Sequence, residues 1–228
     1  MGDISMKSIL AVNFKAYDTA FNDVSLELAK TSNTLSSKLS NVRIILAVPS
    51  YTVEKIYPYY NDIYLQHLDP FDIGAKTGFL PAESIKYMQV KGSIINHSEH
   101  KLVYRDIERI VKVLRNSNKE SLVCADTAGE AAGISYLKPD MVAVEPPELI
   151  GSGIPVSKAK PEIITESIKA VKAINDIPVL AGAGITLPED ATKALELGAS
   201  GILIASAIMK AKEPNKILID FAEAMNSI

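Results

Sequence analysis

The stretch VRIILAVP, residues 42–49, is apolar at almost every position and rich in Val and Ile. A strand with one face in water alternates polar and apolar residues, whereas a strand buried on both faces does not. We therefore predict that this run is a strand of a parallel sheet covered on both sides. Seven further runs of this kind follow the same pattern: Ser8–Asn13, Ile63–Gln66, Ser93–His97, Ser121–Ala125, Met141–Glu145, Pro178–Gly182 and Gly201–Ala205.

The segments between these runs have the period of amphipathic helices. Their apolar residues recur three and four positions apart, with charged residues on the opposite face. In one of them, Thr186 and Pro188 predict a cap and a first helical residue, and Gly198 predicts the end of the helix. Weaker helix signals follow three of the strands. The clear helices are predicted over Val24–Leu39, Leu102–Leu114, Glu162–Ile174, Leu187–Leu197 and Asn215–Met225.

Eight strand–helix units in alternation predict an α/β fold. Periodicity alone leaves two architectures open, a closed barrel and an open doubly wound sheet. No linker or abrupt change in composition divides the chain, so we expect residues 1–228 to form a single domain.

Charge and composition exclude several functional classes. The 228 residues include 24 Lys and Arg against 27 Asp and Glu, for a net charge of −3 without a basic cluster, which argues against a nucleic-acid partner. No stretch approaches the ~20 consecutive apolar residues of a membrane span, and no secretory signal is evident at the start. The single cysteine, Cys124, suits a reducing compartment. We expect a cytoplasmic protein with no membrane partner.

Polar residues gather where the predicted strands end. Strand one runs into Asn13 and Lys15, strand four into His97 and Glu99, and strand six into Glu145. In a parallel barrel these ends share one face, where barrel enzymes build their active sites. Each residue alone is more often structural than catalytic, but their joint placement offers an ammonium, an imidazole and a carboxylate at one site.

Two turns suggest a phosphate site. Gly182–Gly184 follows a strand and precedes a helix, so backbone N–H groups there can approach an anion. The turn Ala205–Ala207 after the last strand supplies a second group of donors. A dinucleotide fingerprint would need a third glycine at position 187, which is Leu.

Three features have two interpretations each. The segment 146–155, with prolines at both ends and glycines inside, is either a packed surface loop or a lid. His97 and His100 with Glu99 between them could hold a cation, although we favour no metal. Cys124 is expected to be a buried packing residue rather than a nucleophile.

Taken together, these motifs resemble the triosephosphate isomerase family, along essentially the whole chain and in the right order. Asn13–Lys15 is similar to its Asn-aromatic-Lys motif, and Asn96–Glu99 contains its His-Ser-Glu motif. Ala143–Pro146 followed by Ile150–Gly153 is similar to the catalytic glutamate and its lid.

Further segments are similar to particular parts of that family. Gln66 and Gly74–Gly78 resemble its third loop. The short chain, Glu148 in the lid and the Gly-Ala-Gly-Ile turn after strand seven resemble the compact archaeal members, whereas other members carry Gly-Gly-Ser in that turn. The resemblance thus implies phosphate binding through backbone N–H groups at Gly184 and Ser206.

The resemblance implies a single (β/α)₈ barrel that interconverts dihydroxyacetone phosphate and D-glyceraldehyde 3-phosphate through an enediolate, in glycolysis and gluconeogenesis, without a cofactor. It assigns Glu145 as the base, His97 as a neutral donor to the substrate oxygens and Lys15 as the fixed positive charge. Asn13 would orient Lys15, and Glu99 would support the site. A short helix beginning at residues 98–101 is expected to keep the imidazole neutral, as in the family.

The same resemblance implies the remaining contacts. Substrate-binding positions are Asn13, Lys15, Ile150, Gly151, Gly184, Ala205 and Ser206. The third loop would place Thr77 against Asn13 and Glu99 of the partner subunit, in a homodimer or, as in compact members, a homotetramer. Two other functions stay open: another phosphosugar barrel enzyme, such as an epimerase or synthase, and a noncatalytic phosphate-ligand binding protein.

Overall fold

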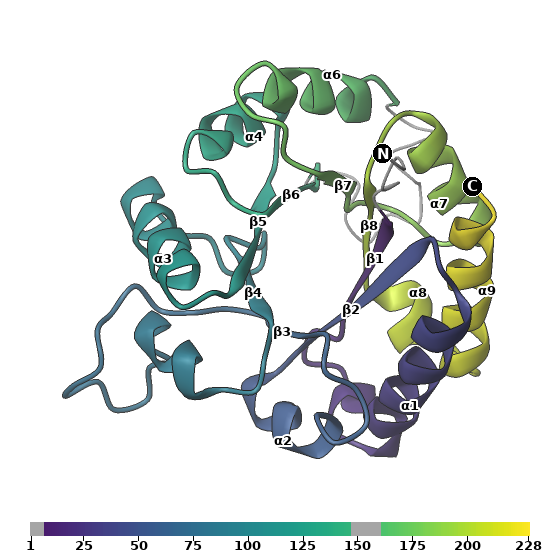
Figure 1. Ribbon diagram of the computed structural model, residues 1–228, viewed down its shortest axis with the longest axis horizontal. Helices are drawn as coiled ribbons and strands as arrows, with labels where there is room; N and C mark the ends of the chain where they lie inside the picture. Colours follow the sequence, from purple (N-terminus) through teal and green to yellow (C-terminus); the bar gives the residue numbers. More distant parts are fainter. Residues whose placement is uncertain (1–6, 147–160) are drawn as a thin grey trace, which may run out of the picture.

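The computed structural model describes residues 7–146 and 161–228 and shows eight parallel strands in a closed ring (Figure 1). Strands follow one another around the barrel in sequence order, so each pairs with its neighbours along the chain and β1 closes on β8. The closed barrel, rather than an open sheet, is the architecture. The strands are β1 Ser8–Asn13, β2 Val42–Val48, β3 Ile63–Leu65, β4 Gly92–Ile95, β5 Glu120–Ala125, β6 Met141–Val144, β7 Val179–Ala181 and β8 Gly201–Ile204.

Closure between the first and last strands depends on a glycine. Ile9 of β1 lies opposite Gly201 of β8. A Cβ at position 201 would lie 2.1 Å from the carbonyl oxygen of Ile9. The two backbones therefore meet at a distance that only a residue without a side chain permits.

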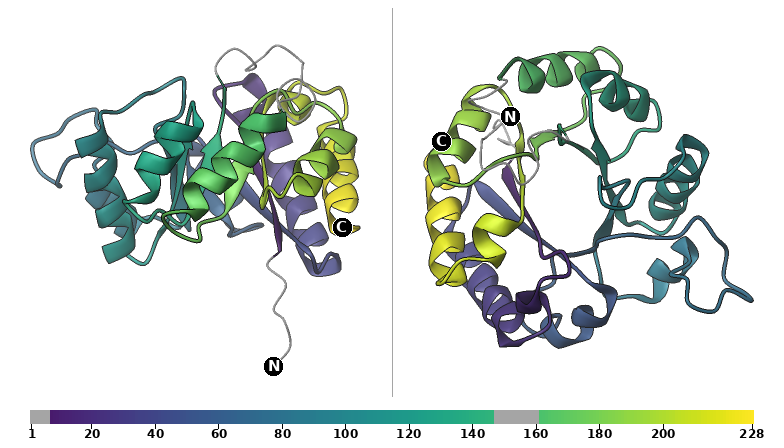
Figure 2. Two further views of the ribbon diagram at one scale, coloured as in Figure 1. Left: turned by 90° about the horizontal axis from the view of Figure 1, so that it is seen from above. Right: turned by 180° about the vertical axis from the view of Figure 1, so that it is seen from behind.

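Helices form the outer ring, seen end-on in Figure 1 and edge-on in Figure 2. The five helices with a clear period in the sequence are confirmed to within two residues at each end. The α-helices are α1 Asp23–Lys38, α2 Val53–Ile56, α3 Tyr104–Asn116, α4 Ala128–Ser135, α6 Pro161–Lys172, α7 Pro188–Glu196, α8 Ser206–Met209 and α9 Pro214–Asn226, and the 3₁₀ helices are η1 Asp18–Ala20, η2 Ser50–Thr52 and η3 Ala82–Tyr87.

Helix α7 begins differently from the prediction. Pro188 is its first residue, but the cap position is Leu187 rather than Thr186. The carboxylate of Asp190 reaches back to accept hydrogen bonds from the backbone N–H groups of Thr186 and Leu187 and from the Thr186 hydroxyl. Gly198 ends the helix as predicted, with a φ of +94°.

Buried side chains form two layers. One lies inside the barrel and includes Tyr64, Cys124 and Leu203, and the larger one lies between the strands and the helices. Successive strand residues point alternately into these layers, which is why the strands are apolar throughout. The inner layer fills the barrel beneath the carboxyl ends of the strands.

The third unit of the barrel departs from regular alternation. After β3 the chain runs through residues 66–81 without a helix and then forms only the 3₁₀ helix η3. Pro70 and Pro81 flank this segment, and Gly78 within it has a φ of +85°. In Figure 2 the segment extends beyond the ring of helices.

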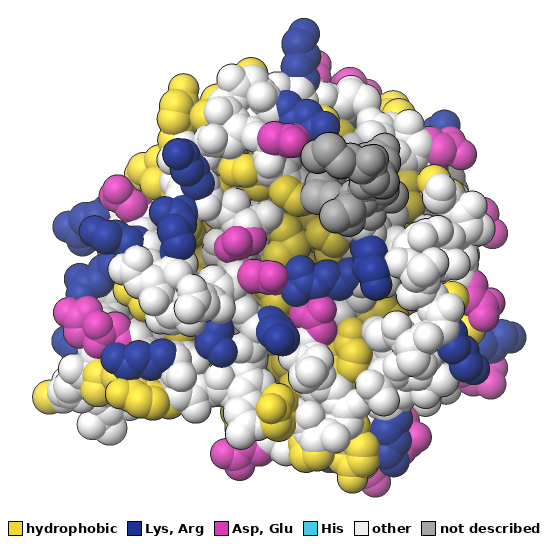
Figure 3. Space-filling view, in the orientation of Figure 1, with side chains coloured by type: hydrophobic (Ala, Val, Ile, Leu, Met, Phe, Trp, Pro, Cys, Tyr) yellow, Lys and Arg dark blue, Asp and Glu magenta, His cyan; other side chains and the backbone are white. Residues whose placement is uncertain are grey.

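Acidic and basic side chains are interspersed on the face that Figure 3 shows, in keeping with the balanced composition. Within residues 7–146 and 161–228, no helix has both the length and the apolar character needed to cross a membrane.

Candidate active site

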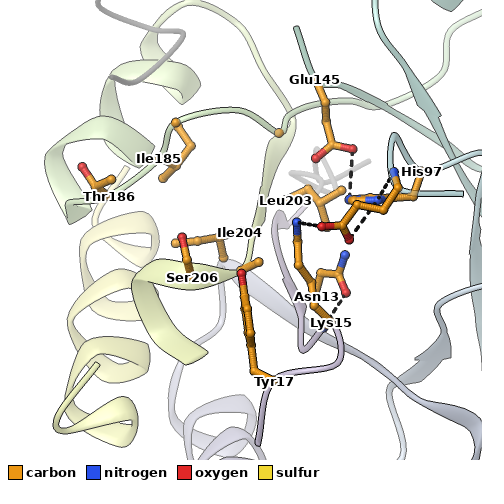
Figure 4. A pocket seen from close by; sticks show the side chains of 14 residues that line it. Asn13, Lys15, Tyr17, His97, Glu145, Ile185, Thr186, Leu203, Ile204 and Ser206 are labelled. Carbon is orange, nitrogen blue, oxygen red and sulfur yellow. Dashed lines mark hydrogen bonds and ion pairs between the residues drawn. The ribbon is translucent and has the colours of Figure 1, made fainter. Parts of the chain in front are cut away.

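The carboxyl ends of the strands surround a cavity of about 330 Å³, drawn in Figure 4. Segments after five strands contribute to it, so residues far apart in sequence meet there. Nearly all of the predicted site residues that the structure describes lie in its wall. The cavity is lined by Asn13, Lys15, Tyr17, His97, Glu99, Glu145, Gly182, Gly184, Ile185, Thr186, Leu203, Ile204, Ala205 and Ser206.

Glu145 directly follows β6 and is buried, with 4% of its surface exposed. Its backbone N–H donates a hydrogen bond to the carbonyl of Ala125. The pairing of β6 with β5 therefore continues one residue beyond the end of β6. Among the described residues, no group donates a hydrogen bond to its Oε2 atom. Burial therefore raises the pKa of Glu145 to about 7, although the thiol of Cys124 and the charge of Lys15 oppose the rise.

Gly182, just after β7, makes room for this carboxyl. A Cβ at position 182 would lie 2.4 Å from Cγ of Glu145 and 3.2 Å from its Oε1. The first glycine of the predicted phosphate turn thus has a second purpose, because it sets where the carboxyl of Glu145 can lie.

His97 faces Glu145 across the cavity, with its Nε2 atom 3.5 Å from Oε2 of the carboxyl (Figure 4). Its Nδ1 atom accepts a hydrogen bond from the backbone N–H of Glu99 at 3.1 Å, so the proton of a neutral ring is on Nε2. Burial first, and then the charge of Lys15, lower the pKa of His97 to about 4. The close contact with Glu145 is thus one between a carboxyl and a neutral imidazole.

The segment after His97 is a turn and not the predicted helix start. The N–H of His100 bonds to the carbonyl of His97 at 2.8 Å, and α3 begins only at Tyr104. The prediction of a helix at residues 98–101 was therefore wrong. The neutral state of this imidazole follows from its burial and from the N–H of Glu99 that occupies Nδ1.

Asn96 anchors the same turn in a left-handed conformation, with a φ of +60°. Its side-chain amide donates to the carbonyl of Cys124 and to Glu130, and its Oδ1 accepts from the N–H of Leu102. Asn is among the few residues that adopt this conformation at low cost. The three bonds fix the backbone that presents His97 to the cavity.

Lys15 also has a left-handed backbone, with a φ of +47°. Asn13 Oδ1 accepts a hydrogen bond from its N–H at 3.0 Å, and the amide of Gln66 donates to both Asn13 Oδ1 and the carbonyl of Lys15. Strain of this kind persists only where surrounding bonds impose it. Asn13 and Gln66 thereby hold Lys15 so that its side chain enters the cavity.

Glu99 completes the charged part of the wall. Its Oε1 lies 2.7 Å from Nζ of Lys15. The Glu99 side chain is 58% exposed, whereas that of Lys15 is 13% exposed. An ion pair with one exposed partner contributes little stability, so this contact chiefly orients the ammonium.

The opposite end of the cavity carries backbone donors. Gly184 has a φ of +70°, which turns the chain after β7 toward the cavity. Ala205 and Ser206 stand at the start of α8, where the first N–H groups of a helix have no partner within the helix.

Ile150 and Gly151 and the rest of the predicted lid, residues 147–155, lie outside the described residues. Thr77 is exposed on the loop after β3, away from this cavity.

Sequence reasoning assigned no role in this site to Cys124 or Tyr17. Cys124 was expected only to pack, but its buried thiol contacts the Glu145 carboxyl. Tyr17 lines the cavity, and Gly182, predicted only as part of the phosphate turn, also makes room for the Glu145 carboxyl. Among the described residues, no group of three or more His, Cys, Asp or Glu side chains is arranged to hold a metal. The alternative metal site of His97, Glu99 and His100 is thus not assembled.

The substitution Gly182→Ala tests the importance of the carboxyl's position. The new methyl group must displace the Glu145 side chain, and a displacement of about 1 Å costs roughly a hundredfold in turnover. We expect kcat of the isomerisation that the family resemblance implies to fall by about that factor. The matched control is Gly133→Ala in α4, where nothing lies within 4 Å of the new Cβ and kcat should not change. Equal kcat values for the two variants would contradict this role of Gly182.

Comparison with known proteins agrees with this geometry. The family model for triosephosphate isomerase matches residues 8–225. Triosephosphate isomerase of Saccharolobus solfataricus is 43% identical over 214 residues, which cover 93% of this chain and 94% of that protein. Triosephosphate isomerase of Methanothermus fervidus is 42% identical (96% and 99% covered), and that of Archaeoglobus fulgidus is 44% identical (92% and 95% covered). With a match along almost its entire length, this chain belongs to the triosephosphate isomerase family.

Proposed function

We propose that this isomerase interconverts dihydroxyacetone phosphate and D-glyceraldehyde 3-phosphate with Glu145 as the base, His97 as the hydrogen-bond donor and Lys15 as the fixed cation. The observation that carries the proposal is the 3.5 Å approach of a buried carboxyl and a neutral imidazole beside an ammonium in one cavity. A base, a hydrogen-bond donor and a positive charge placed together can remove a proton from carbon and stabilise the negative charge that forms.

Each group has one task in the reaction. The Glu145 carboxylate removes a proton from the carbon next to the carbonyl, and the C–H electron pair forms the enediolate. The Nε2–H of His97 donates to the oxygens on which negative charge develops, and Lys15 stabilises that charge. Glu145 then returns the proton to the neighbouring carbon, while the proton of the substrate hydroxyl moves to the former carbonyl oxygen through Nε2 of His97. Both hydrogens stay within the substrate, so no cofactor and no external oxidant or reductant is required. This family is itself the standard example of a neutral catalytic imidazole.

The two shifted pKa values predict the pH dependence of catalysis. Glu145 must be ionised, and its pKa of about 7 means that kcat/KM should fall about tenfold per unit as pH drops below 7. His97 stays neutral well below that range, since its pKa is about 4. We therefore expect a single inflection near pH 7 between pH 5 and 9, once the titration of the substrate phosphate near pH 6 is accounted for. A flat profile over this range would be incompatible with a raised pKa of the base.

The decisive variant is Glu145→Asp, assayed in both directions with the two triose phosphates. The shorter side chain withdraws the carboxylate from the reacting carbon, so kcat should fall by roughly a hundredfold or more while KM changes little. Glu223→Asp, on the exposed side of α9, is the matched control and should retain full kcat. Undiminished kcat in Glu145→Asp would overturn the assignment of the base. Binding without turnover in the unaltered protein would instead favour a phosphate-ligand binding protein.

Association of two chains is a second proposal, supported by the loop after β3. Residues 66–81 project from the barrel in Figure 2 and expose Ile73 and Phe79, each about half accessible. Apolar side chains on a projecting loop fit insertion into a neighbouring copy, as the family resemblance implies for Thr77. We propose a homodimer. The cytoplasmic location stays a prediction.

Light scattering tests the dimer. The unaltered chain should have twice the mass of one chain, and a fourfold mass would indicate the tetramer of the compact members. Thr77→Asp should shift the species toward monomer, because it places a carboxylate near Glu99 of the partner subunit. Thr34→Asp on exposed α1 is the control that should leave the mass unchanged. A monomeric unaltered protein would refute the proposal.

A further inference from the structure

Tyr17 lies in the wall of the cavity without a task in the proposed reaction. It follows Lys15 by two residues, and both side chains line the cavity together with Ser206. In Figure 4 the Tyr17 hydroxyl points into the space between Ser206 and the Lys15 ammonium. Among residues 7–146 and 161–228, no group forms a hydrogen bond with this hydroxyl. A polar group is thus presented to the cavity with its bonding capacity unused.

Contacts of the Tyr17 ring and of the loop that carries it fix the position of this side chain. Its carbonyl accepts the N–H of Ala20 at 2.8 Å, which holds the backbone at the start of η1. The hydroxyl of Thr19 donates to the carbonyl of Met209 in α8, also at 2.8 Å. Nζ of Lys210 lies 4.7 Å from the centre of the Tyr17 ring, while the ring packs against the outer core. The loop after β1 and the segment of α8 and Lys210 therefore jointly fix the position of the ring.

Helix α8 begins at Ser206, and Lys210 directly follows its last residue, so Tyr17 is tied to the end of the cavity that offers backbone donors. The turn after β7 in this chain reads Gly182-Ala183-Gly184 and contributes no side-chain hydroxyl. An anion at this end would meet N–H groups on one side and, on the opposite side, the phenol of Tyr17. A phenol can donate a hydrogen bond to a phosphate oxygen.

We propose that the Tyr17 hydroxyl donates a hydrogen bond to the phosphate group of the substrate and so selects phosphorylated over unphosphorylated trioses. The inference rests on the proposed function, since it places a triose phosphate in this cavity. The hydroxyl lies on the far side of the cavity from Glu145 and His97 in Figure 4. It would therefore contact the phosphate of the substrate rather than the reacting carbons.

The test is Tyr17→Phe, which removes the hydroxyl and keeps the ring under Lys210. We expect KM for glyceraldehyde 3-phosphate to rise about tenfold with kcat within twofold, the size of one hydrogen bond to a charged group. The rate with glyceraldehyde, which has no phosphate, should not change. Tyr136→Phe is the matched control, since Tyr136 is exposed at the end of α4, outside the cavity, and its variant should match the unaltered protein throughout.

Two outcomes would overturn the inference. A KM for glyceraldehyde 3-phosphate within twofold of that of the unaltered protein would show that the hydroxyl does not bind the phosphate. Equal losses with glyceraldehyde and glyceraldehyde 3-phosphate would show a general disturbance of the site instead.

A binding measurement separates this inference from the proposed function. Inorganic phosphate is titrated into the unaltered protein and into Tyr17→Phe, and the dissociation constant is measured by NMR, without turnover. About tenfold weaker binding to the variant supports Tyr17 as a phosphate ligand even if isomerase activity were absent. Equal affinities would refute it even in an active enzyme.

Discussion

The site depends on the burial of one carboxyl group at the mouth of the barrel. Glu145 emerges from β6 into a space that the inner core closes from below, and its Oε2 receives no hydrogen bond from the described residues. A carboxylate without water or donors is a stronger base, which is the property that removal of a proton from carbon requires. Cys124 and Gly182 border the carboxyl and determine how deeply it lies.

The same burial acts in opposite directions on the two facing groups. It raises the pKa of Glu145 to about 7 and lowers that of His97 to about 4, because it disfavours whichever form is charged. Near and above pH 7 the imidazole is therefore neutral while the carboxyl is ionised or readily loses its proton. The fixed charge of Lys15 reinforces the effect on His97 and moderates that on Glu145.

Two residues of the site, Lys15 and Asn96, have strained backbones, and hydrogen bonds with neighbouring residues stabilise these conformations. Asn96 directly follows β4, and Lys15 lies two residues beyond the end of β1; both have left-handed backbones. Asn13 and Gln66 satisfy the backbone of Lys15, while Cys124, Glu130 and Leu102 bind the Asn96 side chain. Rigid strands thus position short, constrained turns, and the cavity is largely formed before a ligand enters.

The sequence by itself determined the eight strands and the main helices, and it indicated the residues for which we propose a chemical role, because buried parallel strands have a continuous apolar pattern and their polar ends share one face. Its periodicity left open whether the sheet closes, and only the family resemblance predicted the barrel, because closure depends on the contact of Ile9 with Gly201 across 192 positions. It also missed Tyr17 and Cys124 in the site and the contact of Gly182 with Glu145, and it predicted a helix after His97 where the chain forms a turn. Contacts of this kind join segments that are distant in the chain, so only the tertiary structure decided them.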